Sequence, residues 1–512
     1  MDTSAANRRI AKNTMFLYFR MLLSMGVTLY TSRVVLEILG VEDFGIYNVV
    51  GGFVSMLSFL NGTMAAATQR FLSFEMGNGD CINLNKVFMT SLQIHILIAV
   101  LVLLLAETIG LWFLNAYMNI PFGRISAANW VYQASIFSMM ITIISVPYNA
   151  VIIANERMKA FAYISILEIT LKLLVAFFLV CIDDDKLKIY SILLLGVSII
   201  IRLVYGIYCR NSFVECHLKM RFDKKKFRQM LDFSGWNLIG SLAVIGRDEG
   251  ENILLNIFYG PVVNAARGIA CQISNAINMF VGNFQIALNP QIIKRYASSD
   301  YENMFSLIFK GSRYSFYLLL ILILPVLLET EYILKLWLKN IPDYSILFTR
   351  LVLIFSLFDT LYKTILVGHL ATGNIRLLQL IVGGLNLSIL PLLLILLNLG
   401  YGPEMVFVIN ILYSLIGLII RLFLFKLVVP LFSILDFCKK VLFNVLCVGI
   451  ISGSFSIILY KYIQLSSDFI EFISVLFFCF FSSVISIYLI GLTSDERFFL
   501  KNKLEERYRR IG

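Results

Sequence analysis

The sequence predicts an all-α protein that crosses a membrane about fourteen times. Hydrophobic residues occupy 59% of its 512 positions and charged residues only 15%, whereas soluble domains carry about 25% charged residues. The mean hydropathy is +0.83, and apolar stretches recur at close to the roughly 20 residues that a membrane helix needs. Continuous apolar runs such as 94–106 and 385–397 indicate helices, because barrel strands alternate apolar and polar residues over about ten positions.

The apolar stretches define the expected spans in chain order. The seventh and tenth are less apolar than the rest, and polar residues 1–14 lead into the first span without a cleavage site, so the first helix should remain as an anchor. The expected spans are 14–35, 44–68, 87–112, 130–154, 160–181, 189–208, 231–258, 262–288, 314–338, 346–368, 377–397, 404–425, 441–460 and 469–491.

The distribution of basic residues predicts the orientation, because basic loops stay in the cytoplasm. With the N-terminus inside, the inner segments hold 28 of the 43 Lys and Arg residues, and the outer segments hold six. Adding or removing one helix near the middle would destroy this asymmetry. The pattern therefore predicts cytoplasmic termini, and it explains the net charge of +11 without a nucleic-acid partner.

The longest basic loop, 210–228, suggests how the chain is organised. Its phenylalanines alternate with lysines, which suits either a segment on the anionic inner leaflet or a plain topogenic loop. An offset of 220 residues also places Gly40 on Gly260 between similar segments, as in transporters with duplicated halves. The expected parts are an N-lobe of helices 1–6 (1–210), a basic linker (211–229), a C-lobe of helices 7–12 (230–426), helices 13 and 14 (427–491) and a basic tail (492–512).

Several kinds of functional site have little support. The chain contains no Gly-Lys dipeptide and therefore no phosphate-binding P-loop, so transport would use an ion gradient, the membrane potential or the substrate gradient. The eight cysteines are scattered and the three histidines lack clustered partners, so we expect no disulfide framework, metal or cofactor. Asp183–Asp185 could imitate a metal-binding motif, but a hydrated outer loop is the simpler interpretation.

Charged residues within the expected spans point to a functional interior, because an ionisable group at a helix centre costs about 2.5 kcal/mol or more. The seventh span carries four charges between positions 247 and 251, next to Gly246 and Gly250. We expect these charges to face a water-filled lumen from a kinked or unwound helix. The alternative is a surface loop between two shorter helices.

Arginines dominate the remaining candidates. Arg267 lies in the eighth span, Arg20 and Arg33 lie toward opposite ends of the first, and Arg70 closes the second. Arg20, Arg33, Arg247 and Arg267 would together give a central cavity a positive field, and the guanidinium group suits phosphate oxygens. Arg33 could instead extend to the outer interface.

Two pairs of opposite charge are spaced four residues apart within spans. Glu168 with Lys172, and Asp359 with Lys363, can each form an ion pair on one helix face. The simpler interpretation of both is structural. Arg421, near an inner helix end, is expected to extend toward the interface.

Four segments resemble one family of transporters. They are Ser32–Tyr47, Ser234–Asn237, Leu254–Ala270 and Asn289–Lys294. The chain is similar, over nearly its full length, to Wzx-type polysaccharide flippases of the multidrug/oligosaccharidyl-lipid/polysaccharide (MOP) exporter superfamily.

This resemblance implies two six-helix lobes in a V plus two C-terminal helices, in a bacterial cytoplasmic membrane. It implies that alternating access carries undecaprenyl-pyrophosphate-linked oligosaccharide from the inner to the outer leaflet, for O-antigen or capsule synthesis. A polysaccharide polymerase is a possible partner. The expected roles are substrate binding by Arg33, Arg247 and Arg267; ion coupling or charge tuning by Asp248, Glu249, Asp359 and Lys363; and an inner-face entrance at Arg20 and Arg70.

Three other functions remain open. A lipid II flippase shares the architecture, although its arginine pattern in the first helix is matched poorly here. A cation-coupled multidrug exporter would need an acidic N-lobe site, and the first helix offers only Glu37 near its outer end. A membrane glycosyltransferase or polymerase is opposed by the short outer loops.

Overall fold

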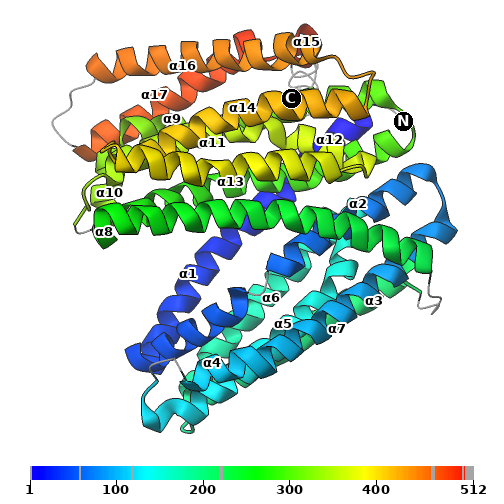
Figure 1. Cartoon of the computed structure of the whole chain (residues 1–512), viewed down its shortest axis with the longest axis vertical. Coiled ribbons are helices and arrows are strands. Elements are labelled where there is room, and N and C mark those ends of the chain that lie inside the picture. The colour runs from blue at the N-terminus through cyan, green and yellow to red at the C-terminus, as the bar shows by residue number, and fades with distance from the viewer. Residues whose placement is uncertain are drawn as a thin grey trace, which may run out of the picture. The chain divides into compact units, whose positions relative to one another are not determined.

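The computed structural model describes residues 3–56, 59–116, 120–217, 223–338, 340–462, 468–498 and 501, and these residues form helices joined by short connections (Figure 1). Among them, twelve helices are long and apolar enough to cross a membrane. The protein is therefore an all-α, multi-pass membrane protein, as predicted.

The chain divides into two compact units. Unit 1 comprises Met1–Leu238 and Ile286–Asp300, and unit 2 comprises Ile239–Gln285 and Tyr301–Gly512. These boundaries differ from those of the expected lobes. Two of the three, after Leu238 and after Gln285, fall inside one long helix, α8 (Lys224–Ala297), and the third follows Asp300. The lobes as drawn from the sequence remain a prediction.

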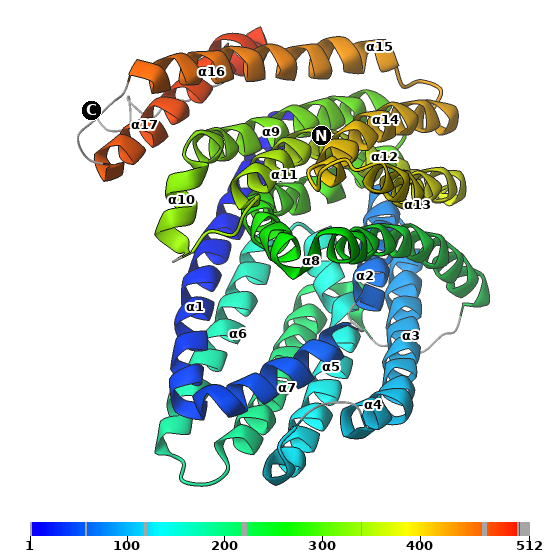
Figure 2. The ribbon, with the colours of Figure 1, turned by 60° about the vertical axis from the view of Figure 1, so that its left-hand side comes forward.

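Unit 1 is a bundle in which α5 packs against α2, α3 and α7, while α1 packs against α6 (Figure 2). Tyr132 of α5 lies at the centre of one core cluster, fully buried, and its hydroxyl donates to the carbonyl oxygen of Ala106 at 2.7 Å. The main helices are α1 (Thr3–Met56), α2 (Phe59–Asn78), α3 (Cys81–Leu105), α4 (Leu111–Ala116), α5 (Ile125–Ala154), α6 (Met158–Phe178) and α7 (Lys186–Ser212).

In unit 2, α14 packs against α11 and α13, while α16 and α17 pack together and against α9 (Figure 2). A core of α8, α11, α13 and α14 side chains includes Leu255, Ala266 and Phe348. The helices are α9 (Tyr301–Leu328), α10 (Thr330–Trp337), α11 (Ser345–Asp359), α12 (Lys363–Thr372), α13 (Arg376–Asn398), α14 (Met405–Val428), α15 (Ile434–Phe437), α16 (Phe443–Tyr462) and α17 (Asp468–Ser486).

Two glycines interrupt the two longest helices in the same way. Gly40 in α1 has φ 77° and ψ 169°, and Gly260 in α8 has φ 77° and ψ −174°. Essentially only glycine occupies this region of backbone space. The sequence offset that aligns these glycines therefore also aligns two equivalent backbone breaks, which supports an internal duplication.

The break at Gly260 also bears on the number of spans. α8 has 74 residues, or about 110 Å at 1.5 Å per residue, which far exceeds the thickness of a bilayer. The expected seventh and eighth spans both lie in α8, on either side of Gly260. The expected second span, 44–68, includes residues 57 and 58, which lie outside the described residues. The count of about fourteen remains a prediction.

The helix that carries the expected ninth span begins earlier than that span. That span was placed at 314–338 with Arg313 in an inner loop, but α9 begins at Tyr301 and ends at Leu328, before α10. Arg313 is buried because its guanidinium donates to Glu496 at 2.7 Å and to the carbonyl oxygen of Gly491 at 3.0 Å. A paired arginine can lie inside a helix bundle, so α9 continues through Arg313 without a break.

Candidate functional site

The charged stretch of the seventh span lies in continuous helix. Within α8 the non-helical residue is Gly260, so neither the surface loop nor the unwound segment expected at Gly246 and Gly250 is present. A side chain added at Gly250 would come within 2.6 Å of Leu390 in α13. This glycine therefore permits close packing of two membrane helices and does not loosen the helix.

Arg247 is held by side chains from two helices. Its Nε and Nη2 donate to Oδ1 of Asp248 at 3.0 and 2.8 Å, and its Nη1 donates to Oδ1 of Asn386 in α13 at 3.1 Å. Its Nε also lies 3.8 Å from Oε1 of Glu251, one helical turn along α8. Arg247 is thus oriented by two carboxylates and an amide.

Arg267 reaches the same group of side chains from the other side of the break at Gly260. Its Nη2 lies 3.1 Å from Oε2 of Glu251 and 3.1 Å from the carbonyl oxygen of Asp248, and its Nη1 lies 3.4 Å from Oδ1 of Asn252. The structure therefore brings together two of the three predicted substrate-binding arginines. We call Arg247, Asp248, Glu251 and Arg267 the α8 charge network.

Glu251 is the central member of this network, and sequence reasoning did not single it out. Only 3% of its side chain is exposed, and its Oε1 accepts a hydrogen bond from Asn410 of α14 at 2.9 Å. Its spacing of four residues from Arg247 was the available signal. The contact with Asn410 was not foreseeable, because that residue lies 159 positions away.

The network has no net charge but retains unused donors. Two arginines face two carboxylates, so the positive field expected from Arg247 and Arg267 is neutralised within unit 2. A guanidinium has five N–H bonds. The hydrogen bonds described above leave one hydrogen on Nη1 of each arginine, one on Nη2 of Arg247 and the Nε hydrogen of Arg267, which is buried without a hydrogen-bond partner. Asp248 has a side chain that is 48% exposed, compared with 16% for Arg247, so the network opens at Asp248.

The predicted pair of Asp359 and Lys363 lies near this network. Its oxygen–nitrogen distance is 3.8 Å, and Asp359 also interacts electrostatically with Arg247. Arg421 stacks on the ring of Tyr362, 3.7 Å from its centroid, and so makes a specific contact inside the bundle. The charges of the tenth span and of the network therefore belong to one region of unit 2.

Glu249 and Arg33 do not join the network. Glu249 is exposed on α8, and Arg33 is an exposed residue of α1 in unit 1. Their predicted roles in ion coupling and in substrate binding remain predictions.

Arg20 lies beside a polar cavity in unit 1. Its guanidinium stacks 4.6 Å from the ring centroid of Phe161 and interacts electrostatically with Glu168 and Tyr205, both of which line a cavity of about 300 Å³. Glu168 forms its predicted ion pair with Lys172 at 2.6 Å. The cavity lies among α2, α5, α6 and α7, and sequence reasoning did not find it because its wall comes from four separate helices.

Arg70, the second residue of the expected inner-face entrance, is buried among aromatic rings. Its guanidinium lies 4.6 Å from the ring centroid of Phe71, 4.8 Å from that of Phe74 and 5.5 Å from that of Phe233. Such cation–π contacts are stabilising. In this conformation Arg70 holds α2 against α8, and its entrance role remains a prediction.

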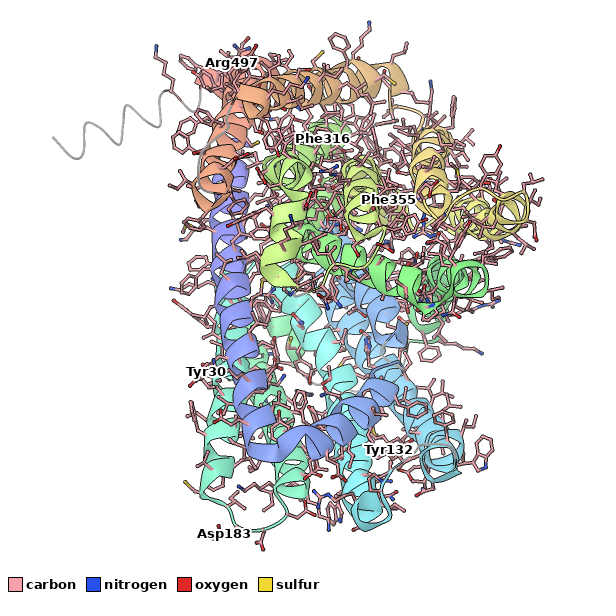
Figure 3. The ribbon with its side chains drawn as sticks, turned by 90° about the vertical axis from the view of Figure 1, so that its left-hand side faces the viewer. Tyr30, Tyr132, Asp183, Phe316, Phe355 and Arg497 are labelled. Atoms are coloured by element: carbon pink, nitrogen blue, oxygen red, sulfur yellow. The ribbon has the colours of Figure 1, made fainter. Side chains whose placement is uncertain are left out.

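The aspartate triplet lies in the loop between α6 and α7, where Figure 3 labels Asp183. Asp185 accepts hydrogen bonds from Arg124 at 3.2 Å and from the backbone N–H of Lys188 at the start of α7. Arg124 also donates to Asp43 at 2.7 Å. Asp185 therefore caps α7, and Arg124 ties three segments of unit 1 together through its ion pairs with Asp43 and Asp185.

Comparisons with known proteins agree with this architecture. Residues 10–296 match a family model described as polysaccharide biosynthesis protein. No significant match was found among curated proteins.

Solved transporter structures share the fold. One is an outward-facing multidrug resistance MATE transporter of the MOP superfamily (TM-score 0.72, 12% identity, covering 84% of this chain and 97% of that one). Another is MATE in complex with MaD5 (TM-score 0.69, 14% identity, covering 83% of this chain and 97% of that one). A third is a MOP superfamily transporter from Pyrococcus furiosus (TM-score 0.63, 13% identity, covering 83% of this chain and 96% of that one). It is described as having a binding pocket of reversed polarity that suggests a different function.

The family model covers more than half of the chain, and the solved structures show the fold. The chain belongs to the polysaccharide biosynthesis protein family and has the fold of the MOP-superfamily transporters.

Proposed function

We propose that this protein flips undecaprenyl-pyrophosphate-linked oligosaccharide from the inner to the outer leaflet of a bacterial cytoplasmic membrane, with both of its termini in the cytoplasm. The product would serve surface polysaccharide synthesis. The observation that carries this proposal is the α8 charge network, which places two arginines with unused donors inside a helix bundle of this family. Ionisable groups within membrane spans usually serve a transport pathway.

The network suggests how a pyrophosphate would bind. Asp248 is the more exposed partner of Arg247, so an incoming pyrophosphate can replace its carboxylate on Nε and Nη2 of that arginine. Arginine suits this exchange because its planar donors match phosphate as well as carboxylate. Glu251 would remain behind the two arginines and hold them in position, since its side chain is almost fully buried.

The same exchange offers a way to couple transport to an ion. A displaced Asp248 carboxylate would lose its hydrogen bonds to Arg247, and it would then favour a proton or a small cation. Release of that ion on the other side would restore the ion pair and expel the pyrophosphate. This assignment keeps the role predicted for Asp248 and gives it a physical basis.

Deletion of the gene tests the proposal. We expect lipid-linked oligosaccharide to accumulate on the inner leaflet, surface polysaccharide to disappear and peptidoglycan synthesis to continue. Plasmid-borne wild-type protein should restore the polysaccharide, whereas Arg247→Ala and Arg267→Ala should insert into the membrane at normal levels without restoring it. Normal transport by both variants would contradict the role of the network.

The other functions predict different phenotypes for the same strain. Loss of a lipid II flippase would stop peptidoglycan synthesis. Loss of a cation-coupled exporter would leave the surface glycan intact and make the cells sensitive to drugs.

A further inference from the structure

The cavity in unit 1 differs in chemistry from the α8 charge network. Its polar lining comes from hydroxyl, amide and carboxylate groups, and none of the described residues that line it is Lys, Arg or His. Its volume of about 300 Å³ lies at the lower end of the range for small-molecule sites. The polar lining residues are Gln69, Thr142, Ser145, Asn149, Glu168, Ser198 and Tyr205.

Three of the four lining hydroxyl groups donate their proton to a backbone carbonyl of their own helix. Thr142 donates its proton to the carbonyl oxygen of Ser138 at 2.9 Å, Ser145 donates to that of Ile141 at 2.7 Å, and Ser198 donates to that of Leu194 at 3.1 Å. A hydroxyl group has one proton and two lone pairs. Because each of these three protons is already used within its own helix, these hydroxyls offer only lone pairs to a ligand. The donors in the wall are the Tyr205 hydroxyl and the Gln69 and Asn149 amide groups.

Two further acceptors complete this wall. Oδ1 of Asn149 is buried with no hydrogen-bond partner, a costly state for an amide oxygen. Glu168 binds Lys172 through Oε1, which leaves its second oxygen as an acceptor. Apolar side chains such as Val146 and Ile201 line the cavity between these groups.

A wall of acceptors, a few amide and phenol donors and aliphatic groups fits a ligand that has many hydroxyl groups and apolar C–H faces. Sugars have this composition. Phosphate fits poorly, because the lining includes the Glu168 carboxylate and none of its described residues is Lys, Arg or His. A bare metal ion is also a poor match, because the cavity is far larger than an ion and the described residues contain no cluster of three or more His, Cys, Asp or Glu side chains that could hold one.

We propose that this cavity binds hydroxyl groups of the oligosaccharide. This inference rests on the proposed function. Glu168 and Asn149 would accept hydrogen bonds from sugar hydroxyl groups. The hydroxyl groups of Thr142, Ser145 and Ser198 would favour sugars whose own hydroxyl groups lie within reach of them. The cavity would therefore determine which sugars are transported.

The test uses the full-length protein in lipid nanodiscs and two probes. One is the lipid-linked oligosaccharide extracted from cells that lack the gene, and the other is sugar-free undecaprenyl pyrophosphate. Thr142→Val removes one acceptor, and the double variant Thr142→Val/Asn149→Leu removes two. The matched control is Thr170→Val, because Thr170 is also exposed, donates to its own helix at 2.9 Å, and does not line the cavity.

We expect Thr142→Val to weaken oligosaccharide binding about threefold to tenfold, as loss of one hydrogen bond does, and the double variant to weaken it further. Binding of the sugar-free probe should stay within about twofold for both variants, and Thr170→Val should change neither value. Arg267→Ala should weaken binding of both probes.

Three results would overturn the inference. Unchanged oligosaccharide binding by both cavity variants would contradict it while leaving the proposed function intact. An altered sodium or proton dependence with unchanged oligosaccharide binding would show that the cavity serves an ion. Failure of the wild-type protein to bind either probe would refute the proposed function, and this inference would fail with it.

Discussion

Replacing Glu251 with glutamine should destabilise unit 2 and also change how substrate is held. The substitution keeps the shape of the side chain but removes a charge that lies 3.1 Å from Arg267 and 3.8 Å from Arg247. Removing one partner of a buried ion pair costs about 3–5 kcal/mol. Glutamine retains one acceptor oxygen for Arg267 or Asn410, so we expect a loss of about 2–3 kcal/mol in the free energy of unfolding.

The assay is equilibrium unfolding in mixed detergent micelles, arranged as a double-mutant cycle. Glu251→Gln, Arg267→Gln and the double variant are compared with wild type, and a coupling energy of at least about 1 kcal/mol is expected for residues in contact. Glu331→Gln is the control. In its ion pair with Lys335 in the same unit, the Glu331 side chain is 58% exposed and that of Lys335 is 63% exposed, so Glu331→Gln should leave the free energy of unfolding close to that of the wild type.

Substrate binding by the Glu251→Gln variant shows whether the α8 charge network has only a structural role or also binds substrate. With Glu251 neutral, Arg267 has lost its competing carboxylate, so lipid-linked substrate should bind more tightly and leave more slowly. Additive free energies within about 0.5 kcal/mol, or weaker substrate binding by a correctly folded Glu251→Gln variant, would refute the account of the network.

Three further predictions address the backbone, the C-terminal helices and a cation–π contact. Gly260→Ala should lower the free energy of unfolding by about 1–3 kcal/mol, because only glycine tolerates this backbone conformation. The control is Gly235→Ala, at a helical glycine with open space around it, which should be neutral or stabilising in the same unfolding assay. Desolvation raises the pKa of Glu496, but the backbone hydrogen bond from Thr493 and the attraction of Arg313 outweigh it and lower that pKa below 4.5. The ion pair of Glu496 with Arg313 should therefore stabilise the protein above about pH 4.5, and this stabilisation should be lost as the pH falls through the lowered pKa of Glu496. Glu496→Gln should reduce the loss of stability in acid. An unchanged dependence of stability on pH in this variant would contradict the pairing. Arg421→Ala should cost about 1 kcal/mol and leave transport near wild type, measured as restored surface polysaccharide; a complete loss would give Arg421 a role in transport.

The sequence predicted the features that depend on local chemistry. Apolar length identified the membrane helices, and spacing by four residues identified the pairs Glu168–Lys172 and Asp359–Lys363. The resemblance around Gly40 and Gly260 identified positions that share one backbone break. Each of these signals lies within one helix or at its end.

Features that depend on distant residues were missed. Arg313 was assigned to a loop because its partner Glu496 lies 183 positions away, and the central place of Glu251 depends partly on Asn410. The glycines of the charged stretch were expected to loosen α8, since their packing against α13 is a property of two helices. Sequence alone cannot show which helices meet, and that is why these interpretations failed.

The central claim is that this chain moves lipid-linked oligosaccharide across a bilayer. The most direct measurement reconstitutes the purified protein in liposomes that contain this lipid in both leaflets, and then adds an impermeant glycosidase. With wild-type protein we expect nearly all of the oligosaccharide to become cleavable, and with Arg267→Ala only the pool of the outer leaflet. Cleavage limited to the outer leaflet in wild-type liposomes, with an imposed ion gradient and intact protein, would contradict the account.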